Sequence, residues 1–263
     1  MPDAPHIELK NLLQELGSVS LAEMDSVNLL NRTDTKFFTD EKTMEGILSD
    51  AAAAGYKALV IEGTKTAGYD SVYFDTPSLR MYLDHHNRRL VRQKVRTREY
   101  LSSGDTFLEI KRKDNHGCTR KKRMCLPGAD FRDFRGNAAA CGFLAGHSRF
   151  PAQELSPSLE TRFRRITLVN PEMTERITID SRVCFDNIRT GRQASLLDGV
   201  VIELKRNGRA ISRMSRILLD SRVKPLRVSK YCIGIALTDP SVKAGRFKMR
   251  IRMIEKQLNK RLI

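Results

Sequence analysis

Tryptophan is absent from this sequence, and aromatic residues together make up only 6% of it. Proteins that bind single-stranded nucleic acid stack the bases on aromatic side chains that are interleaved with cations. No such motif occurs here, so nucleic acid is not expected as a partner. Apolar residues make up 40% of the 263 residues, which argues against wholesale disorder and suffices for one large domain or two small ones.

Paired cysteines and long apolar runs are also missing. The five cysteines are odd in number and show no C-x-x-C spacing, which indicates reduced intracellular thiols rather than a disulfide framework or a zinc site. The opening MPDAPHIELKNLL lacks the basic start and apolar stretch of a secretory signal, and no window approaches the roughly 20 apolar residues that a membrane helix needs. We therefore expect a cytoplasmic protein without a transmembrane segment, either free or at the inner face of the membrane.

Acidic residues are scarce relative to basic ones. The sequence has 31 Asp and Glu against 47 Lys and Arg, a formal net charge of +16. Such an excess concerns the partners of a protein rather than its fold, because it raises the local concentration of anions. The anions to consider are nucleic acid, an anionic membrane surface, and a phosphorylated small molecule or polymer.

The hydrophobic pattern predicts short strands with helices at the edges. We expect one or two short amphipathic helices over residues 6–30, and a helix over 40–55 with Asp40 as its N-cap and Gly55 as its stop. Further helices are expected around 129–145, 210–220 and 227–238. The strand segments between them follow one another with short polar turns, as in an antiparallel meander. This pattern predicts an α+β fold whose sheet curls or closes.

The stretch VRQKVRTREY places four cations on one strand face, because side chains alternate across a strand. They are Arg92, Lys94, Arg96 and Arg98. Like charges in a row repel one another unless something negative lies against them. Other expected strands also carry cations with a few acids on one face. The residues of these faces include Arg32, Asp34, Lys36, Glu109, Lys111, Lys113, Arg165, Arg176, Asp180, Glu203 and Lys205.

Two interpretations of these polar faces are open. Each face could be the solvated side of a one-sided antiparallel sheet, which is a common arrangement. A solvated face usually mixes the two signs of charge, however, and here cations dominate on all the strands together. The alternative is a closed antiparallel β-barrel tunnel with a polar, cationic lumen, flanked by helices. Such a lumen suits a polyanion with a divalent metal, since cations bind phosphate oxygens and carboxylates bind the metal.

An ordered series of segments resembles the VTC domain, over roughly residues 30–240. The segments are RTDTKFF, YFDTPSLRMYLDHHN, VRTREY, TFLEIKRK, RKKR, RFRRITL, ERITID, VIELK and SKYCIGIAL. The VTC domain is the catalytic domain of the vacuolar transporter chaperone polyphosphate polymerases and also occurs in stand-alone bacterial proteins. It belongs, like the CYTH domains, to the triphosphate tunnel metalloenzymes.

The resemblance implies a phosphotransferase with ATP and inorganic polyphosphate as its partners. Enzymes of this family move the γ-phosphate of ATP onto growing polyphosphate inside a basic tunnel, with Mn²⁺ or Mg²⁺ held by a glutamate. At the matching positions, the catalytic cations would be Lys36, Arg96, Arg98, Lys111, Arg165, Lys205 and Lys230. Further substrate-binding cations would be Arg32, Lys94, Lys113, Lys122 and Arg176, and the metal ligands Glu203 and Glu109.

The chain departs from the CYTH triphosphatases on its first strand. Those enzymes begin with E-x-E-x-K, where this sequence has Arg32, Asp34 and Lys36. The loss of acids argues against a tunnel-type triphosphatase or nucleoside triphosphate hydrolase, which stays the alternative together with a non-catalytic binder of polyphosphate or nucleic acid. The phosphate-sensing SPX domain and the membrane helices of the eukaryotic enzymes are not visible in this sequence.

The expected organisation has three parts. Residues 1–30 form a helical segment packed on the barrel, residues 31–238 the catalytic domain, and residues 239–263 a basic helix or tail. Met249 and Met253 lie among the cations of that tail, which could therefore contact an anionic membrane or a membrane partner protein, or pack on the barrel as a solvated helix. We slightly prefer the packed helix.

Two polar pairs in the middle of the chain are expected to be structural. Asp75 and Thr76 precede Pro77 and are expected to be turn and capping groups. His85 and His86 are adjacent on an expected helix, so they cannot face one metal site.

Overall fold

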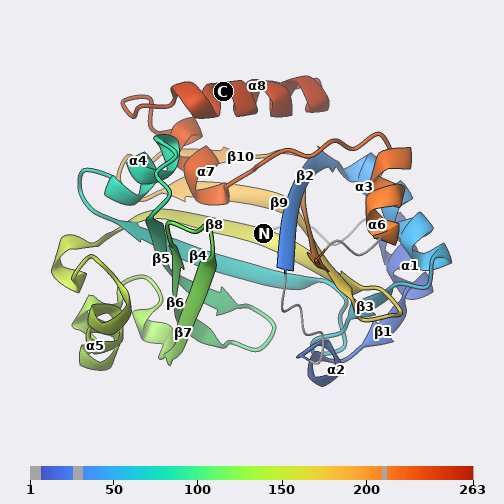
Figure 1. The fold of residues 1–263 in the computed structure, drawn as a ribbon, viewed down its shortest axis with the longest axis horizontal. Helices are drawn as coiled ribbons and strands as arrows, with labels where there is room; N and C mark the ends of the chain where they lie inside the picture. The colour runs from blue at the N-terminus through green and yellow to red at the C-terminus, as the bar shows by residue number, and fades with distance from the viewer. Residues whose placement is uncertain (1–6, 26–31, 209–211, 263) are drawn as a thin grey trace.

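The structure is a computed structural model that describes residues 7–25, 32–208 and 212–262 (Figure 1). Its strands are β1 (Gly17–Val19), β2 (Arg32–Asp40), β3 (Lys57–Leu59), β4 (Ala67–Asp75), β5 (Arg92–Tyr100), β6 (Thr106–Lys113), β7 (Thr119–Leu126), β8 (Ser156–Val169), β9 (Glu175–Asn187), β10 (Gln193–Ser195) and β11 (Gly199–Asn207). Its α-helices are α1 (Ile7–Glu15), α2 (Leu21–Asp25), α3 (Glu41–Ala53), α4 (Arg80–His86), α5 (Ala138–His147), α6 (Arg213–Asp220), α7 (Lys230–Thr238) and α8 (Gly245–Leu258). The predicted α+β class is confirmed.

The eleven strands form one sheet, with the main order β2-β11-β9-β8-β4-β5-β6-β7. All neighbours in this order are antiparallel. The consecutive strands β4 to β7 pair with one another, and β4 pairs with β8 on its other side, so the expected meander is present from β4 to β7. A bulge in β9 near Arg182, whose φ is +52°, shifts the register of β9 against β8 between Arg162 and Arg164.

Local signals place the first long helix correctly. Asp40 accepts a hydrogen bond from the Thr43 backbone nitrogen at 2.8 Å and caps α3, and Gly55 follows the helix with a φ of +79°, which suits glycine. The segment before it matches the expected helices only in part. Between α1 and α2 the chain forms β1, which pairs in parallel with β3 rather than continuing a helix. Residues 26–31 lie outside the described part.

Helices in two groups cover the outer face of the sheet. One group, α1, α3 and α6, packs on the half that contains β11 and β9, where Ile47 and Leu218 are buried with Ile202. The other group is α5 with the 3₁₀ turns before it, and it packs on β5 and β6, where Leu144 is buried with Leu108. In Figure 1 the two groups lie on opposite sides of the molecule.

The helix α7 lies on the opposite, inner face and fills one end of it. Tyr231 and Ile233 of α7 are buried in one cluster with Phe163 and Phe185 of the sheet. Gly234 permits this close approach, because a Cβ atom there would lie 2.6 Å from a Leu159 methyl carbon and 2.7 Å from the Phe185 ring. The helix α8 packs over α7 at the edge of the molecule (Figure 1). No helix of the described residues is long and apolar enough to cross a membrane.

The sheet curls around its inner face, as expected for a tunnel. Lys111 on β6 and Glu203 on β11 lie at separate places in the strand order, yet each affects the pKa of the other across this face. The strands β2 and β7 are the ends of the order, and no backbone ladder joins them in the described part of the chain. Charged side chains and α7, rather than a continuous ring of hydrogen bonds, therefore span the interior.

Candidate functional site

The strand register gathers the predicted cations on the inner face. On β5 and β6, Arg96 lies opposite Glu109, and Lys94 lies opposite Lys111, so all four side chains share one side of the sheet. On β8 and β9, Arg165 lies opposite Asp180. On β2 and β11, Lys36 lies opposite Glu203. The interleaved apolar residues point outward to the helices, so the alternation in the sequence correctly separated the two faces.

A first group of charges centres on the buried carboxylate of Glu109, which is 1% exposed. Arg96 donates to its Oε2 atom from Nε at 2.8 Å and from Nη2 at 2.6 Å, and Lys121 of β7 pairs with its Oε1 atom. Burial alone would raise the pKa of Glu109, but Arg96, Arg98 and Lys121 outweigh it and hold the pKa well below its usual range. Arg96 also donates to the Tyr73 hydroxyl at 3.1 Å.

A second group joins the sheet to α7. Arg165 donates to both oxygens of Asp180, at 2.6 and 2.8 Å, and Lys230 at the start of α7 also donates to Asp180. Burial lowers the pKa of Lys230 to about 8, although Asp180 partly opposes this shift. The Lys230 ammonium is therefore the member of this group that titrates near physiological pH.

A third group surrounds Glu203 on β11. Lys205 lies 2.7 Å from its Oε2 atom and Lys36 lies 3.4 Å from its Oε1 atom. Burial would raise the pKa of Glu203, but the two lysines hold it well below its usual range. The Glu203 side chain keeps 20% of its surface exposed, so a further ligand can reach its carboxylate.

Arg98 is buried and Lys111 is half-buried, and neither has an ion-pair partner among the described residues. Arg98 is 5% exposed and donates from Nε to the Ser71 hydroxyl at 3.0 Å. Among the described residues, no carboxylate lies within ion-pair distance of either cation. Burial lowers the pKa of Arg98 to about 10, and the charge of Arg96 together with burial lowers the pKa of Lys111 well below its usual value. Buried cations without an acid partner are rare in proteins and indicate a missing anion.

An aromatic layer lies beneath these cations. Tyr69 stacks on Phe163 with ring centres 5.3 Å apart, and the Arg98 and Arg165 guanidinium carbons lie 5.1 and 4.9 Å from the centre of the Tyr69 ring. The Lys230 ammonium lies 4.3 Å from the centre of the Phe163 ring. These contacts hold the cations in place without neutralising them, because a ring face attracts a cation but carries no net charge. Charge therefore stays available to an incoming anion.

The remaining predicted cations lie outside the three groups of charges described above. Lys94 donates to the Ser229 hydroxyl at 2.9 Å, just before α7. Lys113 lies opposite Arg92 and Arg176 lies opposite Lys205, both toward strand ends on the inner face. The side chain of Arg32, the first residue of β2, lies outside the described part.

Lys122 requires a correction. It lies opposite Ile110, which packs with the helices on the outer face, and Lys122 is exposed there. Its neighbour Lys121 is the residue that reaches Glu109. The run RKKR contains cations at four successive positions, so alternation alone cannot tell which two face inward. Only the hairpin register of β6 and β7 decides it.

The carboxylates of the inner face differ in how well they suit a metal. Both Glu109 oxygens are taken by Arg96 and Lys121, which leaves little for a metal ion and weighs against its expected role as a ligand. Glu203 is held more loosely. No three of the His, Cys, Asp and Glu residues in the described ranges are grouped to hold a metal ion by themselves. A divalent ion at Glu203 would therefore need phosphate oxygens to complete its ligands, as Mg²⁺ commonly does.

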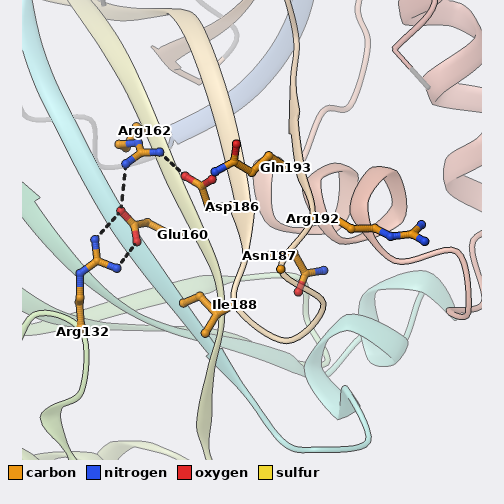
Figure 2. Close-up of a pocket in the computed structure, with 9 residues that line it drawn as sticks. Arg132, Glu160, Arg162, Asp186, Asn187, Ile188, Arg192 and Gln193 are labelled. Carbon is orange, nitrogen blue, oxygen red and sulfur yellow. Dashed lines mark hydrogen bonds and ion pairs between the residues drawn. The ribbon is translucent and has the colours of Figure 1, made fainter. Parts of the chain in front are cut away.

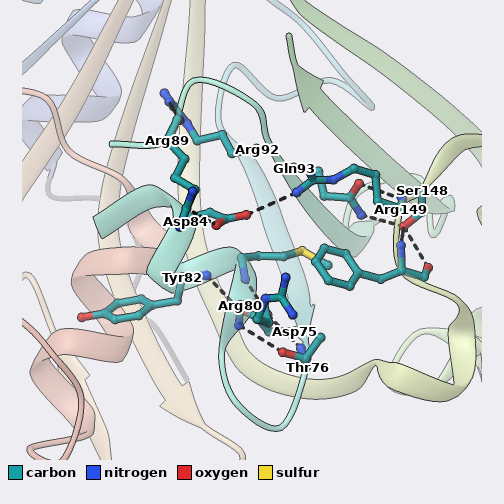
Figure 3. Close-up of polar contacts among 12 residues, drawn as sticks. Asp75, Thr76, Arg80, Tyr82, Asp84, Arg89, Arg92, Gln93, Ser148 and Arg149 are labelled. Atoms are coloured by element: carbon teal, nitrogen blue, oxygen red, sulfur yellow. Dashed lines mark hydrogen bonds and ion pairs between the residues drawn. The ribbon is translucent and has the colours of Figure 1, made fainter. Parts of the chain in front are cut away.

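Asp75 and Thr76 are structural, as expected (Figure 3). The buried Asp75 carboxylate accepts backbone hydrogen bonds from Thr76 at 2.8 Å and from Met81 and Tyr82 at 2.9 Å, at the start of α4. It also accepts the Tyr231 hydroxyl at 2.6 Å and so ties α4 to α7. Asp75 thereby helps to hold α7, and with it Lys230, over the inner face.

A cavity of about 310 Å³ lies away from these groups, on the outer side of β8 and β9 (Figure 2). Two of its three lining arginines are neutralised: Arg132 pairs with Glu160 at 2.7 Å, and Arg162 pairs with Asp186. Arg192 points away from these pairs. The two arginines that face each other across this cavity are therefore paired with acids, unlike Arg98 on the inner face.

Comparison with known proteins assigns residues 31–239 to the model of the VTC domain. No curated protein matches the chain. Among solved structures, an adenylate cyclase candidate from Bacillus halodurans is similar at 12% identity and a TM-score of 0.49, over 76% of this chain and 96% of that one. One from Vibrio parahaemolyticus has 10% identity and a TM-score of 0.44, over 75% and 94%. An adenylyl cyclase candidate from Hippeastrum, described as having a dominant triphosphatase activity, has 14% identity and a TM-score of 0.45, over 77% and 94%.

Proposed function

Because the chain belongs to the VTC domain family, we propose that it is a polyphosphate polymerase, which transfers the γ-phosphate of ATP to the end of inorganic polyphosphate and releases ADP. The observation that carries this proposal is that the buried Arg98 and the half-buried Lys111 have no carboxylate within ion-pair distance in the described residues. A chain of phosphates lying on the inner face would supply the missing negative charge.

The proposed transfer requires little from protein side chains beyond position and charge. An oxygen of the terminal phosphate of the polymer attacks the γ-phosphorus of ATP. The bond between that phosphorus and the β–γ bridging oxygen breaks, and ADP leaves with the electron pair on this oxygen. Because the attacking group is already an anionic oxygen, no side chain has to act as a nucleophile or remove a proton. The protein aligns the two phosphates and neutralises their charge.

The inner face has suitable groups for both tasks. Arg98 presents a guanidinium whose two terminal nitrogens make no hydrogen bond to the described residues, and a guanidinium binds phosphate through two parallel hydrogen bonds. Lys111 and Lys230 add compact positive charges at its sides. Arg96 is held more firmly by Glu109, so its role is to raise the local positive potential and to orient rather than to clamp.

Glu203 is the residue we propose for the divalent ion, Mn²⁺ or Mg²⁺. When bound, such an ion would neutralise phosphate charge as a Lewis acid. Lys36 and Lys205 flank Glu203 and would bind the same phosphate oxygens from either side. This arrangement places an acid between two cations, which suits a metal beside a phosphate.

The direct test is incubation of the purified protein with ATP and Mn²⁺ or Mg²⁺, with and without a short polyphosphate primer, followed by gel analysis of the product. We expect long-chain polyphosphate and stoichiometric ADP. Release of inorganic phosphate without chain growth would instead identify a tunnel-type triphosphatase. Absence of both products across metals and primers would leave a non-catalytic polyanion binder and would sink the polymerase assignment.

The variant that tests Glu203 as the metal ligand is Glu203→Gln, which keeps the shape of the side chain. It removes the carboxylate but leaves Lys36 and Lys205 in place, so we expect turnover to fall about a hundredfold or more while tripolyphosphate binding without metal is kept. Calorimetric titration of tripolyphosphate into the variant separates the two effects. A Glu203→Gln protein with wild-type turnover would exclude this residue as the metal ligand.

A further inference from the structure

The helix α8 has two distinct faces. Its inward side is apolar, with Phe247, Ile251 and Ile254 each at most 4% exposed. On the other side, Met249 is 60% exposed and Met253 is 51% exposed. These methionines are one helical turn apart, so they lie next to each other on the outer surface. The packed inward side confirms that the helix is part of the fold, but it does not account for the two exposed methionines.

Positive charge surrounds the exposed methionines. The cations of α8 are Arg246, Lys248, Arg250, Arg252 and Lys256, against a single acid, Glu255. Burial lowers the pKa of Arg250, and the charges of Arg88 and Arg227 lower it further. Both of these arginines are exposed, so the positive surface of α8 continues onto the segments that carry them. In Figure 1, α8 runs along the edge of the molecule with α7 beneath it, and no described element covers its outer side.

We propose that this face of α8, Met249 and Met253 with the surrounding cations, binds a membrane surface that contains anionic lipids. Cations near such a surface are attracted by the lipid headgroups, and apolar side chains between them enter the boundary of the acyl chains. Methionine suits this position because its side chain is flexible and apolar. The complementary partner must therefore be negative and offer apolar depth, which a lipid surface does and a soluble phosphate does not.

This binding surface is separate from the inner face, and the proposal does not depend on the polymerase reaction. Lipid would lie against the outer side of α8, whose inward side packs on α7, so α7 would lie between the lipid and the inner face. The arrangement predicts a protein that attaches to the membrane reversibly and from one side.

The test is co-sedimentation of the full chain with vesicles of phosphatidylcholine alone or mixed with phosphatidylglycerol. Saturating tripolyphosphate is present throughout, so that the inner face is occupied. We expect binding only to the vesicles that contain phosphatidylglycerol. The Arg252→Gln and Lys256→Gln changes should each weaken binding about fivefold. The Met249→Asn/Met253→Asn double variant should weaken it as well, without altering charge.

Controls of the same chemistry lie elsewhere on the surface. Leu219→Asn removes an apolar side chain of α6 that is 66% exposed, and Lys122→Gln removes an exposed charge of β7. Both should bind vesicles like the wild type. The proposal is overturned if the α8 variants bind as the wild type does, if the controls are equally impaired, or if no binding occurs. Binding to polyglutamate but not to vesicles would also overturn it, in favour of an acidic protein partner.

Discussion

Lys111 and Arg98 lie on the inner face without a carboxylate within ion-pair distance among the described residues, and Arg98 is only 5% exposed. Arg96, Arg165 and Lys230 each have a carboxylate within hydrogen-bonding distance. Glu109 attracts both cations from a greater distance, but this attraction offsets only part of the cost of burying their charge, and the ligand-free protein bears the rest as lost stability. Their environment thus lowers the stability of the ligand-free protein and raises its affinity for an anion.

We predict that Lys111→Met stabilises the ligand-free protein and weakens its binding to polyphosphate. Removing a half-buried cation that has no ion-pair partner should raise the free energy of unfolding by about 1 kcal/mol. Tripolyphosphate affinity should fall about tenfold, since a charge-assisted contact is lost. Urea denaturation and calorimetric titration measure the two effects. Lys122→Met, on the outer face, is the control and should change neither by more than about 0.5 kcal/mol. A less stable Lys111→Met protein with unchanged affinity would contradict the prediction.

Lys230 should make polyphosphate binding depend on pH. Its pKa is about 8 in the ligand-free protein, because burial disfavours the ammonium. A bound polyanion favours the charged form and raises this pKa, so the protein takes up protons on binding at and above pH 8. By linkage, affinity must then decrease as the pH rises through this range.

Calorimetric titration of tripolyphosphate in buffers with different ionisation enthalpies should show this proton uptake. Lys230→Arg keeps a positive charge at all these pH values and should reduce the uptake and flatten the pH profile. Equal proton uptake in the two proteins would show that another group titrates.

At the scale of elements, α7 is the part of the site that does not belong to the sheet. It is held by the Asp75–Tyr231 hydrogen bond, by the stacking of Tyr231 on Tyr73 with ring centres 5.0 Å apart, and by its apolar packing. Since Tyr73 in turn accepts a hydrogen bond from Arg96, the position of α7 is coupled to the cations of β5.

Tyr231→Phe should therefore loosen α7. Loss of the hydroxyl leaves the buried Asp75 carboxylate with one hydrogen bond fewer, and we expect the free energy of unfolding to fall by about 1–3 kcal/mol. Tripolyphosphate affinity should fall too, because Lys230 precedes Tyr231 directly. Tyr82→Phe is the comparison: it removes the hydrogen bond of Tyr82 to the Lys243 carbonyl and should reduce stability without altering affinity. Thermal melting and calorimetric titration of both variants measure stability and affinity. A Tyr231→Phe protein with unchanged stability and unchanged tripolyphosphate affinity would rule out this coupling.

At the scale of the whole molecule, the two faces of one sheet have different roles: one packs against helices and the other presents charge. The outer face is apolar and buried where the two groups of helices cover it, while the inner face concentrates cations that repel one another. The net charge of +16 is thus not distributed evenly over the surface, because part of the positive charge lies on the inner face of the curled sheet.

A polyanion should stabilise the entire fold. At a tripolyphosphate concentration 100 times the Kd, binding contributes about 2.7 kcal/mol, which corresponds to a rise in Tm of roughly 5–10 °C for a chain of this size. Scanning calorimetry with tripolyphosphate should show this rise, and sodium glutamate at equal ionic strength should not. The Lys111→Met protein should show a smaller rise. An equal rise in Tm with glutamate would show that any anion stabilises the protein by screening the repulsion between its cations, and would contradict specific binding of a polyanion.

Much of the chemistry could be predicted from the sequence, because side-chain alternation is a local property of a strand. The period of two is enough to assign Arg96, Arg98, Lys111, Arg165, Glu203 and Lys205 to polar strand faces. The cap at Asp40 and the stop at Gly55 are equally local, since each depends on a few neighbouring backbone groups.

Only the tertiary structure decided how these residues combine. The register of β6 with β7 selected Lys121 over Lys122, and the docking of α7 brought Lys230 to Asp180, fifty positions away in the sequence. Within the described ranges, the same packing left Arg98 and Lys111 without a carboxylate at ion-pair distance and left Met249 and Met253 exposed. Such outcomes depend on contacts between segments far apart in the chain, and periodicity within one segment contains no information about them. The sequence alone therefore determined the kind of surface, and the fold determined which of its charges remain free for a ligand.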